Sequence, residues 1–76
     1  MYIVSISIDK REKEVPDVQP ILTKYGEEIY ARIGLHNISK DKKGIIIVAY
    51  TGKNIKEFIK DLQIDKSVFI NYMKTN

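Results

Sequence analysis

The run 44–52 is the feature that most constrains how this chain folds, because it is apolar, rich in β-branched residues and closed by glycine at both ends. Its seven inner residues fit a strand and are too few for a buried helix. Apolar and polar residues do not alternate in it, so we expect both strand faces to be covered. We interpret it as the central strand of a small sheet. The pattern leaves open which of two sets faces the helices: Ile46, Val48 and Tyr50, or Ile45 and Ile47.

Three other segments also predict strands. Residues 2–8 alternate, and one face is apolar throughout: Tyr2, Val4, Ile6 and Ile8. Residues 28–35 alternate too, which predicts a core-facing set and an outward pair. The core-facing set is Ile29, Ala31, Ile33 and Leu35, and the outward pair is Tyr30 and Arg32. The last strand is expected at 68–73, after a turn at 65–67, with residues 74–76 frayed.

Helical spacing appears in two places. The first face comprises Val15, Val18, Ile21, Leu22 and Tyr25, and the second comprises Ile55, Phe58, Ile59 and Leu62. Pro20 cannot donate a backbone hydrogen bond, so we expect a kink, a 3₁₀ opening turn or a helix start after residue 16, with Asp17 as cap. Gly26 is expected to end this helix. Asn54 and Glu57 have the spacing of a capping box at the start of the second helix.

The predicted order is therefore β-α-β-β-α-β, in one domain that spans residues 1–76. This is the split-βαβ, ferredoxin-like arrangement, an α+β fold. Right-handed crossovers place both helices on one face of an antiparallel sheet of strand order 4-1-3-2. One sheet face then has no helix over it, and it is apolar for either orientation of the central strand. Because monomers rarely leave such a face wet, we expect a dimer or tetramer.

Composition, net charge and the length of apolar runs reduce the classes of function that we expect. The 76 residues contain no cysteine and one histidine, His36, so we expect no metal site within one chain and no cofactor. The net charge of +3 is mild for a dedicated nucleic-acid binder. No apolar stretch approaches the roughly 18 residues of a membrane span. The first residues enter an apolar strand without a basic leader, so we expect a cytoplasmic protein.

Two other classes of function fit parts of the sequence. Lys43 and Gly44, followed by Val48 and Tyr50, partly fit the third strand of RNA-recognition motifs, which have the same element order. Base stacking requires exposed aromatic side chains, and the stacking positions here carry isoleucine. An enzyme is the other alternative. The loop after the first strand has Arg11 but no glycine to bring the backbone close to an anion, and no Ser-His-Asp set, paired-acid site or P-loop is present. We therefore expect no enzyme.

A family resemblance extends from about residue 2 to residue 72. It rests on residues 11–13, the amphipathic helix up to Tyr25, residues 27–29, Arg32-Ile33-Gly34 and the apolar third strand. The chain resembles the ACT-like family of iron-only hydrogenase system regulators, which is similar in fold to ACT domains and to the C-terminal domain of nickel-responsive regulators. The resemblance implies a ferredoxin-like oligomer with a role in transcriptional regulation. We expect the sheet and its helices to use all 76 residues, which would leave no room in this sequence for a helix-turn-helix.

The expected partners are the chain itself and a small-molecule effector or a protein, whereas nucleic acid and membranes are not expected. The candidate effector-binding residues are Lys10, Arg11, Arg32 and His36. The candidate interface residues are Ile3, Tyr30, Val48, Phe69 and Ile70. The interface is expected on the helix-free face, on the uncharged last strand, or on both.

Overall fold

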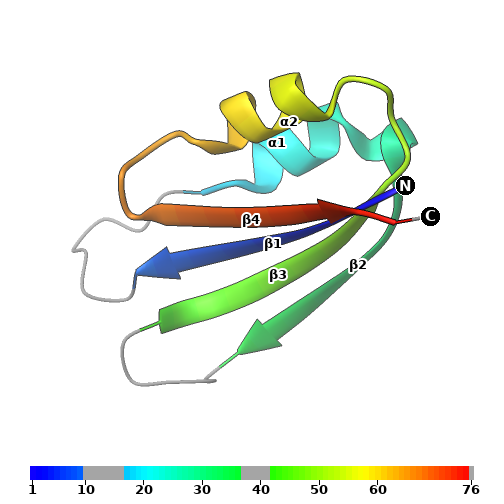
Figure 1. Cartoon of the computed structure of the whole chain (residues 1–76). Coiled ribbons are helices and arrows are strands. Elements are labelled where there is room, and N and C mark those ends of the chain that lie inside the picture. Colours follow the sequence, from blue (N-terminus) through cyan, green and yellow to red (C-terminus); the bar gives the residue numbers. More distant parts are fainter. Residues whose placement is uncertain (10–16, 37–41, 76) are drawn as a thin grey trace.

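A computed structural model of the chain describes residues 1–9, 17–36 and 42–75. The elements are β1 (Tyr2–Asp9), α1 (Gln19–Lys24), the 3₁₀ helix η1 (Gly26–Glu28), β2 (Ile29–His36), β3 (Lys42–Tyr50), α2 (Ile55–Leu62) and β4 (Val68–Lys74). The four strands form one antiparallel sheet of order β2-β3-β1-β4, which is the predicted 4-1-3-2 read from the other edge. Both helices lie over one face of this sheet (Figure 1). The fold is ferredoxin-like, as predicted.

Register in the two central strands settles which side chains face the helices. Val4 of β1 pairs with Val48 of β3, and Tyr2 pairs with Tyr50. Val4, Val48 and Tyr50 are almost fully buried, so the even-numbered residues of both strands point toward the helices. The predicted face of β1 is confirmed. In β3 the inward set is Ile46, Val48 and Tyr50, and the odd-numbered residues point to the helix-free face.

A bulge in β2 makes the predicted faces of that strand wrong in part. Ile29 pairs with Tyr50 and Ala31 pairs with the adjacent Ala49, so Tyr30 is an extra residue in the ladder. Such an insertion shifts the alternation by one position. Ile29 packs toward the core as predicted. Beyond the bulge, however, Ala31, Ile33 and Leu35 lie on the helix-free side, and Arg32, which pairs with Val48, lies on the helix side.

Helix α1 begins at Gln19, with Pro20 in its first turn, so the predicted start after residue 16 is confirmed. Proline is accepted there because the first amide groups of a helix have no intrahelical partner. Asp17 accepts a hydrogen bond from the Gln19 amide at 2.9 Å, although the residue at the cap position is Val18. The helix ends at Lys24, and Gly26 opens η1 rather than closing α1. Val15 and the charged run 10–14 lie outside the described residues.

Helix α2 begins at Ile55, directly after Asn54, as predicted. The predicted capping box is wrong, because the Asn54 side chain makes no capping hydrogen bond. The amphipathic face is confirmed: Ile55, Phe58 and Leu62 are buried, and Ile59 packs against the core. The predicted turn at 65–67 is also present, where the Asp65 carboxylate accepts hydrogen bonds from the backbone and the hydroxyl of Ser67.

The core lies between the helices and the sheet. Its buried hydrophobic residues are Val4, Ile6, Ile8, Val18, Leu22, Tyr25, Val48, Tyr50, Ile55, Phe58, Leu62 and Val68. Three aromatic rings form its centre: Phe58 stacks on Tyr50 with ring centroids 4.4 Å apart, and Tyr25 meets Phe58 edge-on at 4.9 Å. These contacts connect both helices to β3.

Strand β4 extends to Lys74, and the residue after it is also held. The amide and hydroxyl of Thr75 both donate to the Met1 carbonyl, at 2.8 and 3.0 Å. The expected fraying is therefore wrong for Lys74 and Thr75. The two ends of the chain lie side by side (Figure 1).

Candidate functional site: the helix-free sheet face

The helix-free side of the sheet presents three rows of side chains that cross all four strands. Read from β2 to β4, the rows are Ala31-Ala49-Ile3-Met73, Ile33-Ile47-Ser5-Asn71 and Leu35-Ile45-Ser7-Phe69. We call these twelve residues the open face. Nine are apolar, three are uncharged polar residues, and none carries a charge.

Burial within the chain is incomplete on the open face. Ile33 is 60% exposed, Met73 62% and Phe69 48%. The residues of the two central strands are half-buried by their neighbours. The exposed apolar side chains therefore gather on the two outer strands, β2 and β4. A shallow hollow of about 220 Å³ lies between β1 and β4, lined by Ile3, Ser5, Asn71, Tyr72 and Met73.

The predicted interface residues do not all lie on the same side of the sheet. Ile3 and Phe69 belong to the open face as expected. Val48 is fully buried beneath the helices, so its assignment to an exposed interface is wrong. Ile70 pairs with the buried Ile6 and packs partly against the core, so it also points away from the open face. Tyr30, the bulge residue, is 80% exposed on edge strand β2.

The open face also lacks the groups that base stacking needs on its central strands. Six open-face positions come from β1 and β3, and their residues are isoleucine, serine and alanine. Tyr2 and Tyr50 lie on the other side, as alternation predicted for Tyr2. The aromatic residue of the open face is Phe69, on edge strand β4.

Of the four candidate effector-binding residues, the structure describes the side chain of Arg32. Its Nη1 donates to Oε1 of Gln19 at 3.1 Å, beside a hollow of about 250 Å³ on the helix side. Lys10 and Arg11 lie outside the described residues. The backbone of His36 ends β2 opposite Gly44, and its side chain is not among those described. Whether these four side chains lie together therefore stays a prediction, because Arg32 is the one whose side chain falls within the described residues.

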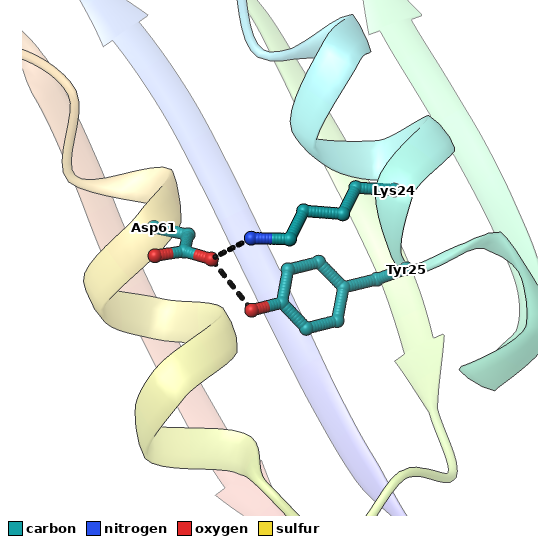
Figure 2. Close-up of polar contacts among 3 residues, drawn as sticks. All are labelled: Lys24, Tyr25 and Asp61. Carbon is teal, nitrogen blue, oxygen red and sulfur yellow. Dashed lines mark hydrogen bonds and ion pairs between the residues drawn. The ribbon is translucent and has the colours of Figure 1, made fainter.

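One polar contact between the helices was not predicted from the sequence. Asp61 of α2 accepts hydrogen bonds from the Tyr25 hydroxyl at 2.6 Å and from Lys24 Nζ at 3.0 Å (Figure 2). The bond from Tyr25, followed by that from Lys24, holds the pKa of Asp61 below its usual value. The same bond raises the pKa of the Tyr25 phenol, because an ionised phenol would face a carboxylate. Asp61 is 36 positions from Tyr25 and 37 from Lys24 in the sequence, so no local pattern predicts these contacts.

The described residues carry no sign of a metal site or of a membrane-spanning helix. Residues 1–9, 17–36 and 42–75 contain no cluster of three histidine, cysteine, aspartate or glutamate residues that could hold a metal ion. Neither described helix has the length and apolar character needed to cross a membrane. Comparison with protein families, with curated proteins and with solved structures found no match to this chain.

Proposed function

We propose that the chain is a non-enzymatic regulatory or interaction module that self-associates, as a dimer or tetramer, through its open face. The observation that carries this proposal is that none of the twelve residues of the open face carries a charge. Surface strands of a monomer that faced water would alternate apolar with polar or charged residues. Here the side facing away from the helices is uncharged in all three rows, and nine of its twelve residues are apolar.

The size of the open face supports an interaction surface. Four strands about 4.8 Å apart and three rows about 6.8 Å apart cover roughly 400 Å² in projection. Apolar patches of about 300–600 Å² are the largest that typical monomers expose, and they are often functional. A second copy of the chain is the proposed occupant, because an uncharged apolar face requires an uncharged apolar partner. Two such faces related by a twofold axis satisfy that requirement reciprocally.

The polar residues of the open face suit this arrangement. Ser5 and Ser7 on β1 and Asn71 on β4 are uncharged and carry both donors and acceptors. Across a twofold interface they can hydrogen-bond to one another without the cost of burying a charge. The free edge of β4 offers a second mode of association, because residues 68–73 contain neither a charge nor a proline that would block strand pairing.

The regulatory part of the proposal has separate support. The resemblance to ACT-like regulators of iron-only hydrogenase systems covers most of the chain, and the ferredoxin-like fold agrees with it. That resemblance supports a cytoplasmic module that responds to a small effector and acts through partners. RNA binding is less well supported, since the central strands of the open face have no aromatic side chain for base stacking.

Sedimentation velocity of the unmutated protein and of Ile47→Lys tests the proposal. Ile47 is central in the open face, so a lysine there should convert the oligomer into a folded monomer. Thr23→Lys adds the same charge at an exposed position of α1 and should leave the oligomer intact. A monomeric unmutated protein at micromolar concentration would show the proposal to be wrong. If Ile47→Lys remains associated, the interface lies on an edge strand instead.

A further inference from the structure

A second surface feature lies on the opposite side of the sheet from the open face. Gln19 of α1, Arg32 and Gly34 of β2, and Ile46 of β3 line a hollow of about 250 Å³. We call it the Arg32 hollow. Gly34 pairs with Ile46, so the two form adjacent parts of its lining. Among these described lining residues one is cationic, one is an amide, and none is acidic.

The bulge at Tyr30 places Arg32 in this hollow. Without the extra residue, the alternation from Ile29 would put Arg32 on the open face, among apolar side chains. With it, Arg32 and Gly34 both point to the helix side. All described residues from Tyr30 to Leu35 are exposed, so the helices leave this part of β2 accessible. Bulges are common beside functional sites, where they re-aim a side chain.

Most of the N–H donors of the Arg32 guanidinium make no hydrogen bond to the described residues. The guanidinium carries five N–H groups, and the one hydrogen bond that it makes within the described residues goes to a neutral amide oxygen. No described carboxylate lies within ion-pair distance of it, whereas Lys24 does pair with Asp61. The side-chain nitrogen of Gln19, Nε2, also makes no hydrogen bond within the described part of the chain. An anion in the hollow would therefore meet a cation and an amide donor.

We propose that the Arg32 hollow binds a small organic acid through its carboxylate. The fork of N–H groups on arginine matches the two oxygens of a carboxylate. Ile46 offers an apolar surface to a short hydrocarbon tail, and Gly34 has no side chain to occupy the space. A single negative charge suits the site, because Arg32 is the one cation among its described lining residues and Asp17 lies two residues from Gln19. This inference rests on the regulatory role proposed above and names the class of effector.

Titration of the ¹⁵N-labelled protein with butyrate, followed by NMR, tests the proposal. Butyrate supplies one carboxylate and a short tail, and butyramide is its uncharged match. We expect amide shifts at Gln19, Arg32, Gly34 and Ile46, with a dissociation constant of about 1 mM for so small a probe. Butyramide should bind at least about tenfold more weakly, because it lacks the charge that pairs with the guanidinium.

Two variants with matched controls sharpen the test. Arg32→Gln should weaken butyrate binding at least about tenfold, whereas Lys56→Gln, which removes the same charge from an exposed position of α2, should leave it unchanged. Asp17→Asn keeps the oxygen that accepts the Gln19 amide and removes a nearby negative charge, so it should tighten binding. Equal binding of butyrate and butyramide, or unchanged affinity in Arg32→Gln, would overturn the proposal.

The two proposals can fail independently. The Arg32 hollow faces away from the open face, so Ile47→Lys should still bind butyrate as a monomer. If that variant dissociates and butyrate does not bind, the anion site is wrong and self-association stands. If butyrate binds and the unmutated protein is monomeric, the anion site stands and the proposed interface is wrong.

Discussion

Individual residues show where this small domain is sensitive to change. The contact of Asp61 with Tyr25 and Lys24 connects the two helices, and its strength depends on ionisation of one carboxylate. The folded-state pKa of Asp61 lies below its value in the unfolded chain. Its contribution to stability is therefore complete above about pH 4, the usual pKa of aspartate, and is lost as the pH falls through the folded-state pKa.

Asp61→Asn should accordingly lower the melting temperature at pH 7, and the difference from the unmutated protein should shrink as the pH falls below about 4. Thermal melts followed by circular dichroism across that range measure the effect. Glu27→Gln, which neutralises an exposed carboxylate in η1, is the control and should have little effect at any pH. A difference between Asp61→Asn and the unmutated protein that does not vary with pH would show that the charge of Asp61 is unimportant.

Gly26 precedes β2 and Gly52 follows β3, and replacing each with alanine should change the unfolding free energy differently. A Cβ at Gly52 would lie 2.5 Å from the Tyr50 hydroxyl oxygen and 2.8 Å from Cγ of Glu28, and the Tyr50 ring is buried. Gly52→Ala should cost about 1–3 kcal/mol of unfolding free energy, as overpacking usually does. Gly26 has open space around its Cβ position, so Gly26→Ala should be neutral or stabilising. Urea denaturation compares the two, and equal effects would contradict the contact at Gly52.

At the scale of elements, sequence patterns identified the four strands and both α-helices of the described fold but not the 3₁₀ helix η1 or the faces of β2. Alternation assigns faces reliably in β1, whose ladder is regular in the region that the pattern covers. In β2 the pattern Ile29, Ala31, Ile33 and Leu35 looks like one face, and the bulge divides it. No residue type marks a bulge at Tyr30, so the sequence could not reveal it. The open face was expected to be apolar, but its β2 members and the position of Arg32 were therefore missed.

Deleting Tyr30 tests the bulge directly. Ile29 and Ala31 already pair with adjacent residues of β3, so the deletion leaves a regular ladder and should change the unfolding free energy by about 1 kcal/mol or less. Deleting Ile33 removes a residue from the regular part and reverses the faces of its neighbours, so it should destabilise far more. Denaturant unfolding of both variants compares them. Similar losses would mean that Tyr30 is part of the ladder.

For the whole molecule, the sheet divides the core from the surface, so adjacent residues of β3 lie in opposite environments. Val48 is fully buried beneath the helices and Ile47, the adjacent residue, lies on the open face. Val48→Lys should therefore prevent folding, because it places an unpaired charge in the core. Ile47→Lys should keep the native circular dichroism spectrum. A folded Val48→Lys would show that the register of β3 is wrong.

The bonds from Thr75 to Met1 have a consequence for the speed of folding. They mark the end of the β1–β4 ladder, which brings together the most distant parts of the chain. Pairings between remote segments slow folding, because a long loop must close before they form. A circular permutant, with a short glycine linker from Thr75 to Met1 and new ends between Lys53 and Asn54, turns this ladder into a hairpin. Stopped-flow refolding of the permutant should be faster than that of the original chain.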